Sequence, residues 1–431
     1  MRMRAEGVFL AACLAAGAGR AEYKPAPVPL MTVWGERLTP ENAWREYPRP
    51  QLVRDGWTNL NGLWDYAVTP KNGEQPAAWQ GQILVPFAPE SALSGVGHPL
   101  EPTELLWYRR SFEAQPVKGR RLLLHFGAVD FRTQVWVNGT EVTDVPNESG
   151  NLPFTLDITE AVKVGSNELV LSVWDPSNEG QQSCGKQTLK PHGCMYTRVS
   201  GIWQTVWMES VPATYVTGYT VVTDIDAGTV AVTVKAEGDL MEAEAEVEVL
   251  RDGKVLAEGE VEAWGQPVTL TLKKPLLWSP DAPNLYDLRI TLESEGGKDV
   301  VKGYFGMRKI EWRKDEKGVP RFYFNNRKTF LQGTLDQGWW PDGLLTPPSD
   351  DAMAFDISLL KSSGFNMMRK HIKIEPLRYY YLCDKLGLMV WQDMVSGWKD
   401  NEDRYALYRR ELKGMMDLLQ AVPCIVMWSP T

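Results

Sequence analysis

The sequence has 431 residues, of which 43% are hydrophobic and 23% charged, and its formal net charge is −9. This composition excludes a disordered chain, and the length predicts two to four domains at roughly 100–200 residues each. The acidic balance argues against nucleic-acid binding, because nucleic-acid-binding proteins carry basic faces.

The first 24 residues, MRMRAEGVFLAACLAAGAGRAEYK, place two arginines before a short apolar stretch at 8–18. This pattern is typical of a secretory signal peptide, cut near Ala21, and the stretch is too short to span a bilayer stably. A lipoprotein is the alternative, because LAAC at 10–13 resembles a lipoprotein cleavage sequence with Cys13 lipidated. The predicted location is therefore secreted or periplasmic, without a membrane span.

Residues 22–308 have the alternating pattern of an all-β region, in two blocks. In RLLLHFGAVDFRTQVWVNGTEV, from residue 121, apolar and polar residues alternate, and Asn138-Gly139 fits a tight hairpin turn. This first block, 22–212, predicts a β-sandwich of eight or more strands. The second block, 213–308, contains a hairpin around Asp252-Gly253 and predicts a small immunoglobulin-like sandwich.

After Glu311 the pattern changes to strands that alternate with helices. Strands are predicted at 329–335, 365–371, 388–393 and 424–428. Helices are predicted from the N-cap Ser349 to Gly364, from Pro376 in a first turn to Gly387, and over 402–420. This order predicts the first half of a (β/α)8 barrel within residues 309–431. A doubly wound sheet is the alternative, but no glycine-rich phosphate loop follows any strand.

Four strands do not close an eight-stranded barrel, and an open edge would leave backbone groups unpaired. We therefore expect that the sequence is interrupted midway through this unit.

Four cysteines follow the predicted signal peptide, and they do not suffice for a disulfide framework in a chain of this length. Cys184 and Cys194 lie ten residues apart, and the sequence leaves open whether they pair or stay as thiols. The histidines and cysteines show no metal-ligand spacing.

Several segments, taken together, resemble glycoside hydrolase family 2. The family's N-terminal jelly-roll sugar-binding domain, its immunoglobulin-like domain and its barrel are similar to these stretches, in order: LLWYRRSFE, HFGAVDFRTQVWVNGTEV, GSNELVLSVWDPS, YTRVSGIWQTVWME, GYFGMRKIEW, GFNMMRKHIKIEPLRYYYLCDKLGLMVWQDM and PCIVMWSPT. The resemblance implies a retaining β-glycosidase of the β-galactosidase, β-glucuronidase or β-mannosidase kind, which hydrolyses O-glycosyl bonds.

The resemblance also implies where the catalytic residues belong. In the family an Asn-Glu pair follows the fourth barrel strand after a short spacer, its Glu is the acid/base, and a second Glu on a later strand is the nucleophile. Here Ser429-Pro430-Thr431 follow the fourth strand and the sequence ends. Neither catalytic Glu is therefore expected within these residues, and the chain alone is expected to be inactive.

Substrate-binding residues are expected at strand ends, where barrel enzymes carry their sites. Arg369 and His371 end the second strand; the family usually has two residues between them, whereas here only Lys370 intervenes. Asp393 ends the third strand, Asp336 follows the first, and Trp398 is a candidate for stacking on a sugar.

Other candidates have a plainer alternative each. Trp339 and Trp340 either shape the pocket or cover the surface, Trp391 is expected in the core, and Asn138 is expected in a turn. Asp130 and Trp136 lie in family-like segments. The sequence alone does not place the loop from Cys184 to Tyr196.

No cofactor is implied; some relatives use a divalent metal, but nothing in the sequence requires one. The expected partner is a carbohydrate, either a β-glycoside or an oligosaccharide, and the sequence determines neither the sugar nor the oligomeric state. The alternative function is a non-catalytic carbohydrate-binding or scaffold protein with a vestigial half barrel.

Overall fold

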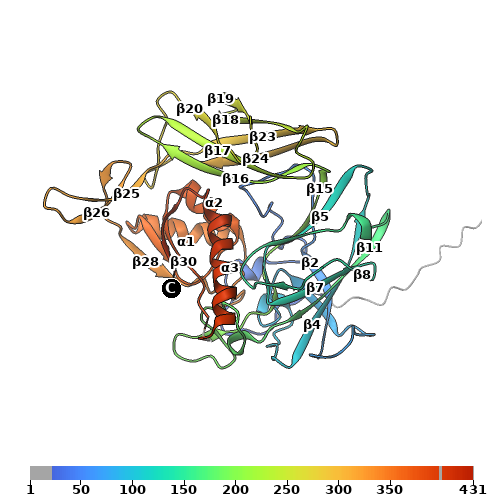
Figure 1. Ribbon diagram of the computed structural model, residues 1–431. Coiled ribbons are helices and arrows are strands. Elements are labelled where there is room, and N and C mark those ends of the chain that lie inside the picture. The colour runs from blue at the N-terminus through green and yellow to red at the C-terminus, as the bar shows by residue number, and fades with distance from the viewer. Residues whose placement is uncertain (1–21, 398–399, 431) are drawn as a thin grey trace, which may run out of the picture.

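The computed structural model describes residues 22–397 and 400–430, and it consists of two β-sandwiches and one layer of alternating strands and helices (Figure 1). The predicted signal peptide, Cys13 and Trp398 lie outside the described residues. Within those residues, no helix combines the length and the apolar character needed to cross a bilayer.

The first sandwich contains two antiparallel sheets with one core between them. Leu124 and Phe126 point into this core together with Val135 and Val137, as their alternation predicts. Asn138 and Gly139 have φ of 52° and 80°, which confirms the tight turn. One sheet is β1 (Trp57–Asn59), β15 (Val206–Pro212), β5 (Arg120–Phe126) and β10 (Phe154–Asp157). The other is β3 (Gly81–Val85), β2 (Gly62–Pro70), β4 (Glu104–Ala114), β11 (Gly165–Trp174), β7 (Arg132–Val137) and β8 (Thr140–Glu141), with β9 (Asn147–Glu148) beside β7.

A long insertion follows β11 and contains only short pairings. Here β12 (Gln187–Thr188) pairs with β13 (Tyr196–Thr197), and β14 (Gly201–Ile202) pairs with β6 (Val129–Asp130). Cys194, in this insertion, is an exposed free thiol, so the disulfide alternative with Cys184 is not the one observed.

The second sandwich encloses its own core, formed by alternating residues of a three-stranded and a four-stranded sheet. Asp252 and Gly253 form the predicted turn, with φ of 50° and 75°. The sheets are β16 (Tyr215–Asp224), β17 (Thr229–Glu237) and β20 (Val268–Thr271), and β19 (Lys254–Glu260), β18 (Glu244–Arg251), β23 (Tyr286–Ser294) and β24 (Gly297–Phe305); β21 (Trp278–Ser279) and β22 (Ala282–Pro283) form a separate pair.

The segment after Glu311 starts with strands that the sequence did not predict. A small antiparallel sheet of β25 (Ile310–Lys314), β26 (Pro320–Phe324) and β27 (Arg327–Lys328) extends away from the molecule (Figure 1). The expected strand at 329–335 is correspondingly shorter, at β28 (Gly333–Asp336).

The last layer is a parallel sheet in the order β28, β29 (Met367–Lys370), β30 (Met389–Asp393) and β31 (Ile425–Ser429). Its crossover helices are α1 (Asp350–Ser362), α2 (Leu377–Leu386) and α3 (Glu402–Leu419). Ser349 caps α1 by accepting from the Ala352 N–H, as predicted, and Gly387 ends α2 at φ 77°. Pro376 is the N-cap of α2 rather than a first-turn residue. That this layer is half of a barrel stays a prediction.

Helix α3 lies between the parallel sheet and the first sandwich (Figure 1). Glu411 is fully buried there and accepts a hydrogen bond from the Ser149 hydroxyl at 2.8 Å. A Cβ added at Gly414 would lie 2.4 Å from Leu152, so the helix needs a glycine to approach this closely. The α/β layer and the first sandwich are therefore in direct contact.

Asp384 joins α2 to the second sandwich. Its side chain is fully buried and accepts from the Tyr304 hydroxyl at 2.7 Å and from the Cys424 N–H at 2.6 Å, while its carbonyl accepts from the Trp278 indole. Burial raises the pKa of Asp384 to about 7, although these hydrogen bonds and Arg308 act in the opposite direction. The carboxyl group therefore stays protonated in the folded chain at mildly acidic pH.

We expect Asp384 to make the chain less stable as the pH rises from about 4 to 7. An unfolded Asp has a pKa near 3.9, so in this range the unfolded state releases a proton that the folded state still holds. The Asp384→Asn variant, which cannot ionise, should lack this loss, and its stability relative to the parent should improve by roughly 2 kcal/mol between pH 5 and 7. Urea unfolding midpoints of the parent and of Asp384→Asn at pH 5 and pH 7 measure this difference in stability. Stability profiles that run parallel over this range would contradict the raised pKa of Asp384.

Candidate functional site

The four parallel strands end at one edge, and their last residues bring most of the predicted site together. In the strand register, Asp336 lies beside Lys370, and Asp393 lies beside Ser429. Carboxyl ends of parallel strands are where α/β proteins place their binding sites.

One face of this sheet is only partly covered. The cross-strand row Leu335, Arg369, Trp391 and Met427 lies on it, with Leu335 45% exposed and the other three half-buried. The neighbouring residues Met368 and Val390 point to the opposite face, where they are buried against α2 and the other helices. Because side chains alternate along a strand, Asp393 shares the face of Trp391 and Arg369.

Asp393 is the centre of a three-residue cluster. Its side chain is fully buried, and both of its oxygens accept from Arg369 Nε at 3.0 Å, while Oδ2 also lies 2.9 Å from Arg369 Nη2. His371 Nδ1 lies 2.8 Å from the same Oδ2, so the carboxylate favours the tautomer with a proton on Nδ1. Arg369 also stacks 5.2 Å from the centre of the Trp391 ring. One buried carboxylate thus fixes two side chains that remain partly exposed.

The opposite face carries a second, buried charge network. Lys370 is fully buried, and its ammonium lies 2.5 Å from Asp336 Oδ2 and 2.8 Å from Glu375 Oε1. Lys373 lies 2.9 Å from Glu375 Oε2 and donates to the carbonyls of Gly338 and Leu345. These charges are paired within the layer and hold the loops that follow β28 and β29.

The paired charges outweigh desolvation for two members of this network, Asp336 and Lys370. Burial acts to raise the pKa of Asp336, but the charge and hydrogen bond of Lys370 lower it below its usual value. Burial acts to lower the pKa of Lys370, and its two carboxylate partners raise it above its usual value instead. For Lys373 burial prevails, and its pKa is lowered. The Asp336 carboxylate and the Lys370 ammonium are therefore both charged at neutral pH and form an ion pair.

The insertion of the first sandwich reaches this edge. The Gly185 N–H donates to the Ser396 carbonyl at 2.8 Å, and the rings of Tyr196 and Trp339 stack with their centres 4.7 Å apart. Ile372, which follows His371, has φ 47°, a conformation that is rare for a β-branched residue and turns the chain sharply there. The loop from Cys184 to Tyr196, which the sequence did not place, thus lies against the loops of the α/β layer.

The structure brings together three of the predicted site residues, namely Arg369, His371 and Asp393. Asp336 ends the adjacent strand but pairs with Lys370, and it lines a cavity of about 240 Å³ with Trp339 and Trp340. Trp391, expected in the core, is half-buried and its indole nitrogen has no hydrogen-bond partner.

The candidates in the first sandwich lie elsewhere. Asp130 is buried and accepts from the Gln187 amide at 3.0 Å, and burial raises its pKa well above the usual value. Trp136 stacks on Trp107, and Asn138 is a turn residue as expected. None of these three lines the cavity that Asp336 lines.

Sequence reasoning missed Lys370, Lys373 and Glu375. The signal was present in KHIKIEP, where charged residues alternate directly after a buried strand, but such residues normally face solvent. Among the described residues, no group of three His, Cys, Asp or Glu side chains is arranged to hold a metal ion.

Two family models match the chain. Residues 214–308 match "Glycosyl hydrolases family 2", and residues 102–206 match "Glycosyl hydrolase 2 galactose-binding domain-like". These segments correspond to most of the second sandwich and to the larger part of the first.

The chain is similar to a β-galactosidase of Thermoanaerobacter pseudethanolicus, with 27% identity over 75% of this chain and 44% of that protein. A putative β-glucuronidase of Formosa agariphila is 26% identical over 90% of this chain and 47% of its own length. The chain thus spans less than half the length of these curated relatives.

Among solved structures, the β-glucuronidase from Ruminococcus gnavus in complex with D-glucuronic acid superposes with a TM-score of 0.74, at 20% identity, over 90% of this chain and 68% of that chain. The β-D-glucuronidase of Dictyoglomus thermophilum superposes with a TM-score of 0.70, at 20% identity, over 89% of this chain and 67% of that chain. These two likenesses concern the fold. Because both matched segments carry models of one family and the curated relatives are named as glycosidases of that kind, residues 102–206 and 214–308 are domains of glycoside hydrolase family 2.

Proposed function

We propose that this chain forms the sugar-binding part of a retaining β-glycosidase that hydrolyses O-glycosyl bonds of β-galactosides, β-glucuronides or β-mannosides. The Asp393 cluster carries the proposal. It presents the Arg369 guanidinium and the His371 ring on the partly covered face of a parallel sheet, at the edge where barrel enzymes bind substrate. Fixed donors of this kind orient sugar hydroxyl groups.

The edge also carries aromatic rings. The loop after β28 and the insertion of the first sandwich contribute the stacked pair Trp339 and Tyr196. The cavity of about 240 Å³ that Trp339 also lines belongs to the face of Lys370, and the Asp393 cluster does not line it. Aromatic rings and a few fixed polar groups are the usual lining of small-molecule sites. We propose that the four strands are the first half of a (β/α)8 barrel whose mouth this edge forms.

The carboxylates of this edge are positioning groups in the proposal. Retaining hydrolysis requires two carboxyl groups about 5–5.5 Å apart, one that protonates the leaving oxygen and one that attacks the anomeric carbon. Asp393 is occupied by Arg369 and His371, and Asp336 by Lys370. The proposal therefore assigns the acid/base and the nucleophile to residues outside this sequence, and Asp393 to orientation of the sugar-binding side chains.

Nitrophenyl β-galactoside, β-glucuronide and β-mannoside test the proposal, in hydrolysis and in calorimetric binding assays with the 431-residue chain. We expect binding of one of the three without turnover. Asp393→Asn should weaken that binding by at least about tenfold, because it releases Arg369 and His371. Asp252→Asn, at a 90% exposed turn of the second sandwich, makes the same charge change and should leave binding unaltered.

Two outcomes would overturn the proposal. Turnover by this chain would show that it holds its own catalytic carboxyl groups. An unchanged affinity in folded Asp393→Asn would show that the cluster does not position a sugar.

A further inference from the structure

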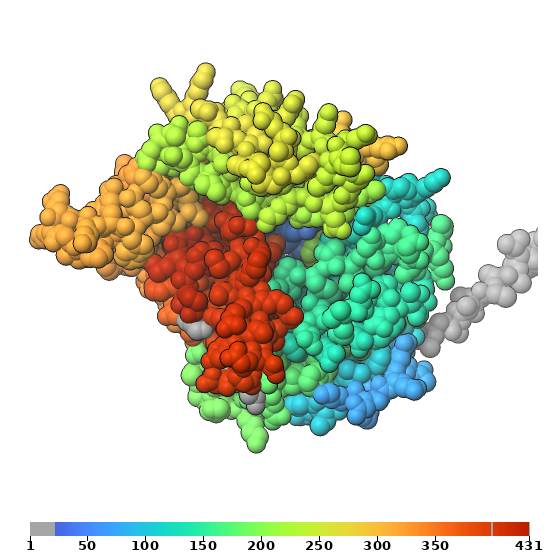
Figure 2. All heavy atoms as spheres, viewed as in Figure 1, coloured from blue at the N-terminus to red at the C-terminus, as the bar shows by residue number. Residues whose placement is uncertain are grey.

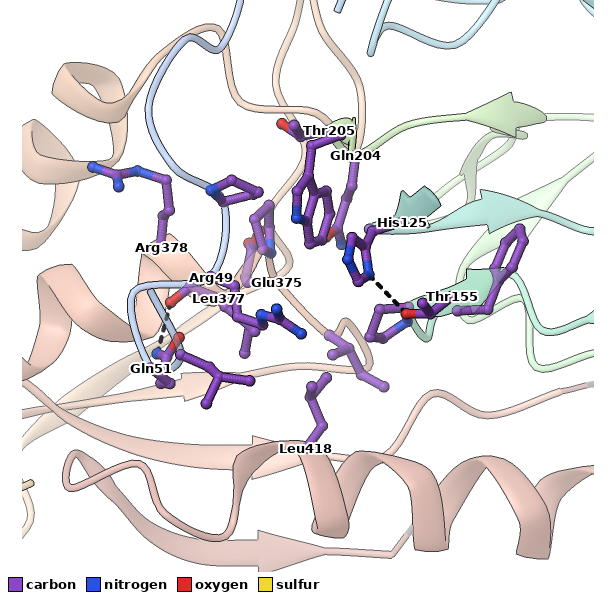
Figure 3. Close-up of a pocket in the computed structure, with 18 of the residues that line it drawn as sticks. Arg49, Gln51, His125, Thr155, Gln204, Thr205, Glu375, Leu377, Arg378 and Leu418 are labelled. Carbon is purple, nitrogen blue, oxygen red and sulfur yellow. Dashed lines mark hydrogen bonds between the residues drawn. The ribbon is translucent and has the colours of Figure 1, made fainter. Parts of the chain in front are cut away.

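A second cavity lies where the two sandwiches meet the α/β layer. It measures about 250 Å³, and neither Arg369 nor His371 nor Asp393 lines it. Figure 2 shows the recess between α3 in red, the second sandwich in yellow-green and the first sandwich in teal, with blue atoms of the N-terminal segment inside it. Because residues as far apart in the sequence as Arg49 and Leu418 line it, it exists only in the assembled fold (Figure 3).

The floor of this interface cavity is the outward face of the β1-β15-β5-β10 sheet. Thr155, His125 and Trp207 are directly paired across β10, β5 and β15, so they form one row on that face. The His125 ring stacks on Trp207 with centres 4.8 Å apart, and Thr155 Oγ1 lies 2.8 Å from His125 Nδ1. Outward side chains of such a sheet normally face water, whereas here the other layers cover them.

Four lining residues have a buried polar atom that makes no hydrogen bond, namely Nε of Arg49, Oε1 of Gln51, Nε2 of His125 and Oε2 of Glu375. Two of these atoms have an ionic contact, because His125 Nε2 lies 3.5 Å from Glu209 Oε2 and Glu375 Oε2 lies 2.9 Å from Lys373. Figure 3 shows Arg49 and His125 extending into the cavity from opposite sides. A buried polar atom that lacks a partner costs roughly 1–3 kcal/mol, so native proteins satisfy such atoms with protein, water or ligand. The cavity thus offers both donors and an acceptor.

The buried charged groups that line the cavity are paired, whereas Lys235, which also lines it, is exposed and has no ion pair among the described residues. The Arg49 guanidinium is 3.1 Å from Glu209 Oε2, and Arg378 pairs with Asp350. Burial lowers the pKa of His125 to about 4, so the ring is neutral at neutral pH. An anionic or cationic ligand buried against these paired groups would therefore lose its hydration without gaining a buried counter-charge.

Much of the remaining wall is carbon, and the polar side chains that also line it are Asn151, Gln204, Thr205, Thr217 and Thr346. The indole N–H groups of Trp44 and Trp203 donate to Pro347 and Gly150 carbonyls, so only ring carbons are left to line the cavity, together with Ile374 and Leu418. At about 30 Å³ per water, the volume corresponds to about eight waters, which suits one six-membered ring with its hydroxyl groups.

We propose that this interface cavity binds one neutral monosaccharide, at a site separate from the edge of the parallel sheet. The hydroxyl groups of such a ring both donate and accept, which matches Arg49, Gln51 and His125, and its C–H groups match the carbon wall. An occupant here contacts all three layers and stabilises their arrangement, because it binds only the assembled form.

Gly218 of β16 provides a direct test. It lines the cavity, and a Cβ added to it meets no atom within 4 Å, so Gly218→Phe places a ring in the cavity without a backbone clash. Gly56→Phe is the matched control, since Gly56 is exposed and equally open. The binding of galactose, glucose, mannose and glucuronate is measured by calorimetry for the parent chain and for both variants. It is also measured for Asp393→Asn, which alters only the sheet edge.

We expect at least one neutral hexose to bind more tightly than glucuronate. Gly218→Phe should weaken that binding by at least about tenfold, whereas Gly56→Phe and Asp393→Asn should retain it. His125→Phe, which keeps a ring beside Trp207 but removes both nitrogens, should weaken it as well and decides the case if Gly218→Phe does not fold. Absence of hexose binding, tighter binding of glucuronate than of any hexose by Asp393→Asn, in which the proposed edge site is weakened, or loss of hexose binding in Asp393→Asn alone would overturn this proposal. The first two outcomes do not bear on the proposed glycosidase site.

Discussion

Replacing Lys370 by Met should destabilise the α/β layer by about 3–4 kcal/mol, because breaking a buried ion pair leaves the partner carboxylate buried without its counter-charge. Lys370 is fully buried between Asp336 and Glu375, and Glu375 is only 2% exposed. Met has a similar length, so the change removes the charge more than the volume. Glu375 would keep Lys373 but lose its 2.8 Å contact, and Asp336 would lose its only ammonium partner described here.

Hydrogen exchange of the β29 and β30 amides measures this effect locally, which matters in a chain of several layers. A loss of 3 kcal/mol corresponds to roughly a hundredfold faster exchange by local opening. Lys385→Met is the matched control: Lys385 lies on the exposed side of α2, and its loss should cost less than about 1 kcal/mol. Equal effects of the two substitutions would show that the buried network contributes little.

Much of the α/β layer could be predicted because its signals are local. Ser349 and Gly387 mark helix ends through chemistry that acts within one turn, and the buried strands β30 and β31 are short apolar runs. The β25–β26 hairpin was missed because β25 is largely exposed, with Trp312 61% exposed, and β26 buries only Phe322 and Phe324, which is too short an alternation to indicate a strand by itself. Pattern reasoning detects burial, and it fails where a strand is not buried.

The site was predictable only where its position follows from topology. Arg369 and Asp393 were found because strand ends of a parallel sheet converge on one edge. Lys370 was taken as a spacer between Arg369 and His371, since a lysine in a sequence is normally solvated and its burial depends on Glu375. The interface cavity had no local signal, because β5, β16 and α3 contribute to it from separate layers.

The contact between the two sandwiches depends on another buried cation, and Arg54→Met should lower the free energy of unfolding by about 3–5 kcal/mol. Arg54 is 6% exposed and precedes β1. Its guanidinium lies 2.8 Å from Glu209 of β15 and binds Asp299 of β24 through Nε at 2.9 Å and Nη2 at 2.8 Å. Glu209 would keep Arg49 at 3.1 Å, but Asp299 would keep only the Val216 N–H.

The same contact predicts a pH dependence. Burial acts to raise the pKa of Glu209, but Arg49, His125 and Arg54 outweigh it and lower the pKa below its usual value. Stability from ionised Glu209 is therefore present above the unfolded pKa, near 4.3, and is lost as the pH falls toward the folded pKa. The difference in urea midpoint between Arg54→Met and the parent should be largest at pH 7 and shrink below pH 4, where Glu209 becomes protonated in the variant.

Lys302→Met separates this effect from a general loss of charge. Lys302 pairs at 2.8 Å with Asp55, the residue after Arg54, and so links the same two segments, but the two side chains are 53% and 81% exposed. Its loss should cost less than about 1 kcal/mol at any pH. If Arg54→Met behaved like Lys302→Met, the two sandwiches would be held by their apolar contacts. Cooperative unfolding of both sandwiches in the parent, separated into two transitions in Arg54→Met alone, would instead identify the buried guanidinium as the group that couples them.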